Sequence, residues 1–325
     1  SGLVGSRPEE IVVMNTLTVN LHLLMVSFFR PRGKRRKILI EKHAFPSDRY
    51  AVQSQLKFHG LDPPADLVEL APRDGENLIE ESSVEDYLAA HGAEIALVLW
   101  PGVQYITGQA FTLPRIARAA RLAGANIGFD LAHHVGNLPL ELHDSGCDFA
   151  AWCHYKYLNA GPGAVAGGFV HAKHHKNTDL PRFNGWWGNA RQSRFRMAHD
   201  FEAEHGADAW QISTPLLLSM APLRASLQLF DEAGSGPLRT KSVAMTSYLV
   251  RGIHEHLQER LEILTPLEPE RRGSQLSRRV RSGRDAGRAL FEYLEEQGVL
   301  TDWREPDVIR VAPVPMYNSF TDCFE

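Results

Sequence analysis

The stretch NIGFDLAHHVGN, residues 126–137, followed by FAAWCHYKYLNAGPG, residues 149–163, decides the fold class of this chain. Asn126 to Asp130 is a short apolar run bounded by turn residues, which is typical of a strand buried on both faces of a parallel sheet. Asp130 would then emerge at the carboxyl edge of the sheet, where ligands bind in open α/β folds. Lys156 follows in a Tyr-Lys-Tyr run before a glycine-rich turn.

The same pattern extends through the first two thirds of the chain. Three more runs have the character of buried strands: Lys37 to Glu41, Ile95 to Trp100 and Gly163 to His171. Thr112 is a helix cap before a segment of helical period that ends at Gly124, and Thr214-Pro215 predicts the start of a helix through Phe230. Strands that alternate with helices predict an α/β fold with a mainly parallel sheet.

A second, smaller domain is predicted after the turn-rich segment Asp231 to Gly236, where the composition becomes more charged. We therefore expect a large domain over residues 1–236 and a small domain over residues 237–325, with a long helix at its start. The expected order of the small domain is helix 238–258, strand 261–265, strand 275–280, helix 286–297 and strand 307–311. This order indicates an α+β unit.

Composition narrows the class of protein. The 325 residues are 43% hydrophobic and 23% charged, as in ordinary folded enzymes, and the net charge of −4 gives no general attraction for nucleic acid or anionic membranes. The most apolar stretch, Leu21 to Phe29, is about half the ~20 residues of a membrane span. Three cysteines without disulfide or zinc spacing favour a reducing, cytoplasmic setting. Because the chain opens at Ser1-Gly2 without methionine, we expect an upstream part to be missing.

Asp130 and Lys156 together point to pyridoxal phosphate. A lysine among apolar residues loses water, which favours the neutral amine that forms a Schiff base, and the cofactor needs an acidic partner on its ring nitrogen. Taken singly, an aspartate at a strand end is more often a turn residue and a lysine is more often exposed. His133 and His134 are adjacent and have no third ligand at suitable spacing, so we expect one of them beside the cofactor and no metal.

Several motifs carry a family resemblance. They are Asp130-Leu-Ala-His133, Tyr155-Lys-Tyr-Leu-Asn-Ala-Gly161, Ile309-Arg-Val-Ala-Pro-Val-Pro-Met-Tyr-Asn-Ser319, Met14 to His22, Phe45-Pro-Ser-Asp48, Tyr105-Ile-Thr-Gly-Gln109 and Gly185-Trp-Trp-Gly188. Together they resemble the kynureninases, fold-type-I pyridoxal-phosphate enzymes of the aminotransferase class V superfamily. The Asp-x-Ala-His motif alone also occurs in cysteine desulfurases, whereas the combination is specific to kynureninases.

The resemblance implies roles for the cofactor site. Lys156 would form the internal aldimine and later move the proton, Asp130 would pair with the pyridinium nitrogen, and His133 would lie beside the ring. Phe45 would stack over the ring, although simple core packing is the alternative. Other implied cofactor contacts are Pro46, Ser47, Asp48, the phosphate ligand Tyr155 (by position also a candidate general acid), and the phosphate-binding turn Leu17 and Thr18. That turn coincides with a helix start that the sequence independently predicts after Thr16.

The resemblance also implies a homodimer with shared active sites. Trp186 and Thr214 match positions that reach the phosphate from the neighbouring subunit. Arg310 matches the arginine that grips the substrate α-carboxylate, for which a planar bidentate donor is suited; its alternative role is a surface salt bridge. Ser213, next to Thr214, is expected near the region that senses a 3-hydroxyl group on the substrate.

The implied activity is hydrolysis of L-kynurenine or 3-hydroxy-L-kynurenine to anthranilate or 3-hydroxyanthranilate and L-alanine, through an aldimine, a quinonoid and a ketimine, in tryptophan catabolism and NAD biosynthesis. Pro101 departs from family members that carry a serine there. Two alternatives stay open: a desulfurase-like or aminotransferase-like enzyme, and an inactive fragment of the same fold. A desulfurase needs a cysteine on a mobile loop, whereas Cys147 and Cys153 fall in an apparent strand and Cys323 is terminal.

Overall fold

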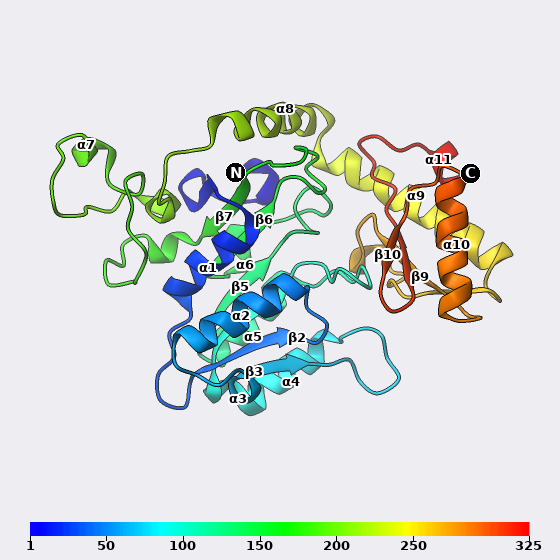
Figure 1. The fold of residues 1–325 in the computed structure, drawn as a ribbon, viewed down its shortest axis with the longest axis horizontal. Helices are drawn as coiled ribbons and strands as arrows, with labels where there is room; N and C mark the ends of the chain where they lie inside the picture. Colours follow the sequence, from blue (N-terminus) through cyan, green and yellow to red (C-terminus); the bar gives the residue numbers. More distant parts are fainter. Residues whose placement is uncertain (325) are drawn as a thin grey trace.

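Seven strands form the larger sheet of the computed structural model, which describes residues 1–324 (Figure 1). Their spatial order is β1-β7-β6-β5-β4-β2-β3. The bounds are β1 Ile11–Met14, β2 Lys37–Glu41, β3 Leu67–Leu70, β4 Ile95–Pro101, β5 Asn126–Asp130, β6 Phe149–Cys153 and β7 Ala166–Val170. Every strand runs in the same direction except β7, which is antiparallel to both of its neighbours. The carboxyl ends of the other strands therefore share one edge.

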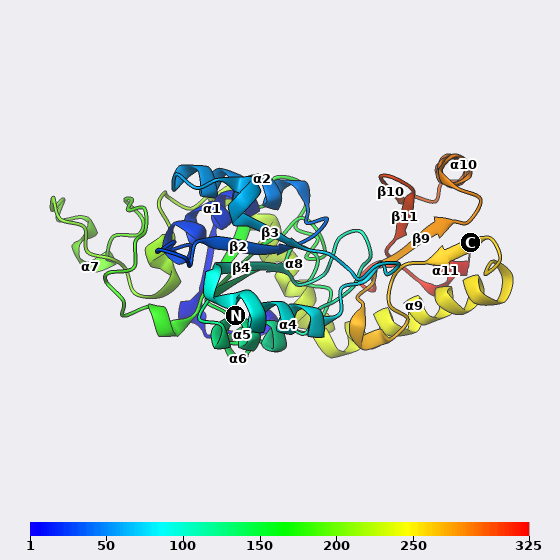
Figure 2. The same ribbon diagram turned by 90° about the horizontal axis from the view of Figure 1, so that it is seen from below.

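Helices cover both faces of this sheet (Figure 2). One face carries α1 (Leu17–Phe28) and α2 (Pro46–Phe58), and the other carries α4 (Glu81–His91) and α5 (Leu113–Leu122). In α5 the apolar residues Ile116, Ala117 and Ala120 face the sheet and are buried, as their helical spacing predicts. Two hydrophobic layers thus enclose the strands, which explains why the strands are apolar on both faces.

The smaller sheet is antiparallel, in the order β10-β11-β9-β8. Its strands are β8 Leu261–Ile263, β9 Leu276–Val280, β10 Asp302–Arg304 and β11 Val308–Val311. Two long helices, α8 (Leu217–Ala233) and α9 (Ser235–His256), lead from the larger sheet to the smaller one, and α10 (Arg284–Glu296) packs beside it (Figures 1 and 2). Short helices complete the fold: α3 Pro63–Asp66, α6 Leu142–Ser145, α7 Arg191–Arg194 and α11 Phe320–Phe324. Across residues 1–324, no helix combines the length and the apolar character needed to span a bilayer.

Most predicted elements are present, with two corrections. The strand predicted over residues 163–171 is shorter, because Gly163 has a positive φ of 77° and belongs to the turn before β7. The helix start predicted at Thr214-Pro215 is wrong: α8 begins at Leu217. The Leu217 N–H donates to the Pro215 carbonyl, so the proline lies in a tight turn instead of at the first helical position. The sequence analysis also did not predict β1, β3 and β10.

Candidate active site

A cavity of about 540 Å³ opens at the carboxyl edge of the larger sheet. Asp130 and Glu41 are the last residues of β5 and β2, and both line it. Arg304 and Arg310, from β10 and β11, close it from the smaller sheet. The remaining lining residues are Thr16, Leu17, Thr18, Phe45, Ser47, Asp48, Pro101, Val103, Tyr105, Ala132, His133, Tyr155, Lys156, Tyr157, Asn159, Ala312, Val314 and Tyr317. The cavity therefore lies where the sequence predicts a ligand site.

Lys156 and Asp130 come together in this cavity, as predicted. Lys156 lies in a tight turn after β6, held by a 2.9 Å hydrogen bond from the Asn159 N–H to its carbonyl. Its Nζ is 5.6 Å from the centre of the Phe45 ring. Asp130 Oδ1 accepts the Ala132 N–H at 2.7 Å, which fixes the orientation of the carboxylate. The site thus has an amine and an anchored carboxylate in one enclosure.

Two more buried carboxyl groups line the cavity beside Asp130. Burial raises the pKa of Asp48 well above its usual range, and the neighbouring Asp130 carboxylate raises it further. Burial, followed by the charge of Asp130, likewise raises the pKa of Glu41 well above its usual range. Asp48 Oδ1 is buried without a hydrogen-bond partner in the described residues. Sequence reasoning missed Glu41, although it ends β2 just as Asp130 ends β5.

The start of α1 forms a turn that suits an anion. Thr16 is the extended N-cap residue and α1 begins at Leu17, so the N–H groups of its first turn have no intrahelical partner. Thr18 Oγ1 lies 2.8 Å from Ser47 Oγ, at the start of α2. Backbone N–H groups, two hydroxyls and the helix dipole all favour a phosphate at this end of the cavity.

His133 and Arg310 occupy the side of the cavity that faces the smaller sheet. Burial, with the nearby cations Lys156 and Arg310, holds the pKa of His133 well below its usual range, so its ring is neutral at physiological pH. Arg310 donates from Nη1 to the Tyr105 carbonyl at 2.7 Å and pairs through Nη2 with Asp302. Its Nε is buried without a partner in the described residues. The salt bridge considered above as the alternative role of Arg310 is thus present, with Asp302 as the partner. The Arg310 side chain is nevertheless only 11% exposed, and it lines the cavity.

Four predicted site residues lie outside this cavity in their own chain: Pro46, Trp186, Ser213 and Thr214. Pro46 is the first residue of α2, next to the lining residues Phe45 and Ser47. The cavity also contains polar residues to which the sequence analysis assigned no role, namely Tyr105, Tyr157, Arg304 and Tyr317. The three tyrosines Tyr105, Tyr157 and Tyr317 belong to the motifs of the family resemblance, which was the available signal.

Comparison with known proteins identifies the family. A family model described as the kynureninase C-terminal domain matches residues 238–325. The kynureninase of Xanthomonas euvesicatoria pv. vesicatoria (strain 85-10) is 59% identical over 320 residues, which cover 98% of this chain and 75% of that protein. The chain belongs to the kynureninase family. The kynureninase of Stenotrophomonas maltophilia (strain K279a) is also 59% identical, over 98% of this chain and 76% of that protein. The resemblance predicted from the sequence is confirmed.

Solved structures share the fold of this kynureninase-family chain. The apo cysteine desulfurase of Thermococcus onnurineus NA1 has a TM-score of 0.79 at 16% identity and covers 99% of this chain and 78% of that one. The cystine C-S lyase C-DES, in complex with cysteine persulfide, has a TM-score of 0.82 at 20% identity over 99% of this chain and 81% of that one. The fold is that of fold-type-I pyridoxal-phosphate enzymes, as predicted.

The cysteines of the chain do not have the setting of a desulfurase cysteine. Cys147 and Cys153 are free and buried, before and at the end of β6, and burial raises the pKa of Cys147 to about 12. Cys323 lies in α11 and is not among the residues that line the cavity. A persulfide acceptor needs an exposed, deprotonated thiol near the substrate. The burial and positions of the cysteines therefore favour a kynureninase over the desulfurase-like alternative.

Proposed function

We propose that this chain is a pyridoxal-phosphate-dependent hydrolase that converts L-kynurenine, its 3-hydroxy form, or both, to anthranilate or 3-hydroxyanthranilate and L-alanine. The observation that carries the proposal is the meeting of Lys156, Asp130 and Arg310 in one cavity of a chain 59% identical to kynureninases. Lys156 and Asp130 would offer an amine and a carboxylate to the cofactor, and Arg310 would offer a guanidinium to the substrate.

The cavity residues fit pyridoxal phosphate. The free N–H groups of Leu17 and Thr18, with the Ser47 hydroxyl, would hold its phosphate, and Tyr155 lines the same cavity. Asp130 would hold the proton on its ring nitrogen, and Phe45 would cover the ring. The unpartnered Asp48 Oδ1 and His133 Nδ1 are buried polar atoms for which a bound group would provide a partner.

The bound cofactor would supply an electron sink for the pair of electrons released at the substrate α-carbon. Lys156 Nζ would take the α-proton and return a proton during the reaction. Tyr155 suits a hydrogen-bond donor to the cofactor phosphate, because burial raises its pKa to about 12 and keeps its hydroxyl protonated. Water is consumed: its oxygen joins the ketone carbon of the side chain as the Cβ–Cγ bond breaks. The carbon Cβ gains one proton and becomes the methyl group of alanine, and a second proton goes to solvent as the aromatic fragment leaves as a carboxylate.

Product release tests the proposed function directly. When L-kynurenine is added to the cofactor-loaded protein, we expect anthranilate, followed by its fluorescence, and alanine, assayed in the same tube, in equal amounts. The same assay with 3-hydroxy-L-kynurenine measures the substrate preference. A yellow, cofactor-loaded protein that releases neither product from either substrate would contradict the proposal.

Arg310→Lys is expected to weaken substrate binding selectively. A lysine keeps the charge but loses the forked guanidinium that a carboxylate can bind at two points, so KM should rise roughly 10- to 100-fold. The absorbance of the bound cofactor should not change, because Arg310 enters the cavity from β11 and not from the phosphate end. Arg284→Lys, at an exposed ion pair with Glu305, is the matched control. An unchanged KM for Arg310→Lys would remove this residue from the substrate site.

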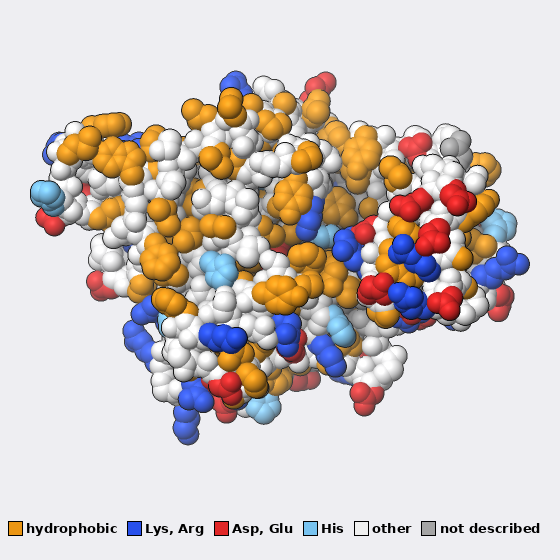
Figure 3. Space-filling model, viewed as in Figure 1, with side chains coloured by type: hydrophobic (Ala, Val, Ile, Leu, Met, Phe, Trp, Pro, Cys, Tyr) orange, Lys and Arg blue, Asp and Glu red, His pale blue; other side chains and the backbone are white. Residues whose placement is uncertain are grey.

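We also propose that the chain acts as a cytoplasmic homodimer, with residues 1–236 and 237–325 as its two domains. Orange hydrophobic side chains are exposed along the upper edge of Figure 3, over the loop that carries α7 and over α8. The exposed large apolar residues of these segments include Phe183, Phe195, Met197, Leu217 and Leu218. Such a patch is typical of a protein interface. The Trp186 ring packs edge-to-face on Phe195 within this loop, 5.8 Å between centres. These exposed apolar side chains lie in the same part of the chain as Trp186 and Thr214. They support a dimer in which each copy of the chain completes the cavity of the other.

A further inference from the structure

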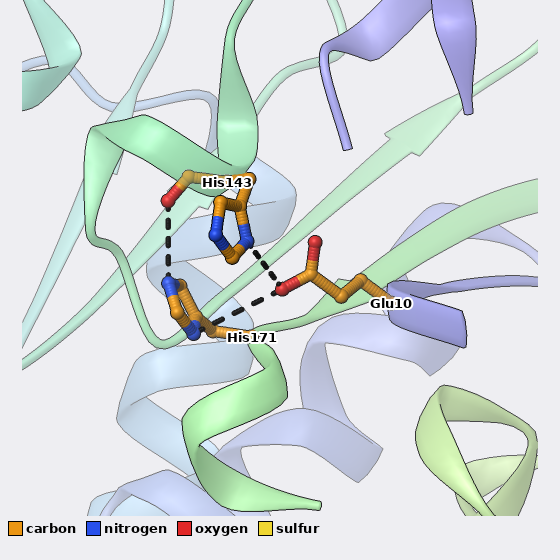
Figure 4. A group of neighbouring side chains, drawn as sticks. All are labelled: Glu10, His143 and His171. Atoms are coloured by element: carbon orange, nitrogen blue, oxygen red, sulfur yellow. Dashed lines mark hydrogen bonds and ion pairs between the residues drawn. The ribbon is translucent and has the colours of Figure 1, made fainter. Parts of the chain in front are cut away.

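A carboxylate and two imidazoles converge in a cluster (Figure 4), and none of the three residues lines the cavity. Glu10 Oε1 lies 2.8 Å from His143 Nδ1 and 3.9 Å from His171 Nδ1. Glu10 is fully buried, and the two histidine side chains are 26% and 15% exposed. We propose that Glu10, His143 and His171 form a binding site for a divalent cation of the Zn²⁺ type.

The three residues come from separate segments at the edge of the larger sheet opposite the cavity. Glu10 directly precedes β1, His171 directly follows β7, and His143 lies in α6 before β6. Since β1 runs from Glu10 toward Thr16, which lines the cavity, the cluster lies at the other end of the strand. A cation here would not touch the substrate; it would join three segments that are far apart in the sequence.

The separations between the ligand atoms lie around those of a tetrahedral zinc site, and all three atoms are within 4.8 Å of one another. Bonds of about 2.1 Å place neighbouring ligand atoms about 3.4 Å apart, and the two observed separations lie on either side of this value. The centres of the His143 and His171 rings are 4.9 Å apart, and a rotation of one ring from the present 23° between the planes would aim both Nδ1 lone pairs at one ion. Two imidazoles on one tetrahedral ion have centres about 5 Å apart. Small side-chain movements would complete the coordination.

Backbone groups already orient the proposed ligands. The Ala172 N–H donates to Glu10 Oε1 at 2.8 Å and the Arg7 N–H donates to Oε2 at 2.9 Å, so the carboxylate is fixed in place. His171 Nε2 lies 3.2 Å from the His143 carbonyl, to which it donates. The second ring nitrogen, Nδ1, then carries a lone pair, as in metal-bound histidines whose other nitrogen is bonded to a carbonyl. This Nδ1 also accepts the Lys173 N–H at 3.1 Å, a bond that a cation would displace.

The charge balance also favours a cation. His143 Nδ1 donates its proton to the Glu10 carboxylate. His171 Nδ1 carries a lone pair instead, and it lies 3.9 Å from the same carboxylate with no hydrogen bond to it. A divalent cation would take the place of the His143 proton, which would move through solvent to His143 Nε2 and leave the Nδ1 lone pair for the metal. The neighbouring Lys173 and His174 pair with Asp148 at 2.7 and 2.8 Å, so they do not compete for this position. Three protein ligands leave a fourth position for water.

Metal content tests this site on the cofactor-loaded protein after removal of any purification tag. After incubation with Zn²⁺ and dialysis, we expect about one Zn²⁺ per chain. The midpoint of thermal unfolding should rise by about 4 °C at a free Zn²⁺ concentration a hundred times Kd. His143→Gln and His171→Gln should lose both effects, while His254→Gln, an exposed histidine of α9, should keep them.

Glu10→Gln provides a second variant that keeps an oxygen for one of the two backbone N–H donors, Ala172 or Arg7, but removes the anionic ligand. We expect it to bind Zn²⁺ at least roughly tenfold more weakly, with the far-UV circular dichroism of the parent protein. The proposal is wrong if the parent protein retains no Zn²⁺, or if the histidine variants retain as much as His254→Gln. Because metal content and unfolding are measured without substrate, neither outcome bears on the proposed hydrolysis.

Discussion

Lys156→Ala is expected to abolish both turnover and covalent attachment of the cofactor. In the parent protein, borohydride should reduce the Schiff base, so that the denatured chain keeps the mass of the cofactor. The variant has no amine at this position and should show no added mass, and kcat should fall about 10⁴-fold or more because the group that bonds the cofactor and moves the proton is gone. Mass spectrometry of the reduced, denatured chain is the measurement.

Lys57→Ala is the matched control, since Lys57 is an exposed lysine near the end of α2. It should retain the borohydride-fixed mass and the parent rate. If Lys156→Ala still fixed the cofactor covalently, another lysine would have to carry it, and the proposed site would be wrong. The prediction thus separates the position of the cofactor from the identity of the substrate.

The fold, and the part of the candidate site formed by the larger sheet and α1, can be predicted from local sequence patterns. The run Asn126 to Asp130 is a strand with those bounds, and its last residue lines the cavity because parallel strands end at one edge. Thr16 marks the start of α1 because its extended conformation precedes a helical run, which also places the phosphate turn. Each of these features depends on residues that are close together in the chain, and sequence patterns report such features well.

The side of the cavity formed by the smaller sheet could not be predicted in the same way. Arg304 reaches it from β10, a strand of three residues whose pattern is too short to detect. The ion pair between Asp302 and Arg310 depends on the hairpin of β10 with β11. Glu41 was overlooked because nothing in its local sequence places β2 beside β4. The Glu10, His143 and His171 cluster is hidden for the same reason: only the sheet topology brings those positions together.

Two inactive chains are expected to restore activity when they form one dimer. In the proposed homodimer, each site takes Lys156 from one chain and Trp186 and Thr214 from the other. The double variant Trp186→Ala/Thr214→Ala loses two donors to the cofactor phosphate, which should weaken cofactor binding about 10³-fold and leave it nearly inactive at limiting cofactor. Lys156→Ala is inactive for the separate reason given above.

When the two variants are co-expressed with different tags, half of the dimers should be hybrids, and each hybrid should contain one site built only from unchanged residues. The mixture should therefore recover about a quarter of the parent activity, and hybrids purified through both tags about half. Neither variant alone should recover on mixing with itself. A purified hybrid that stays inactive would show that each cavity is complete within its own chain. This outcome would overturn the shared site while leaving the roles of Lys156 and Asp130 unchanged, because both line the cavity of one chain.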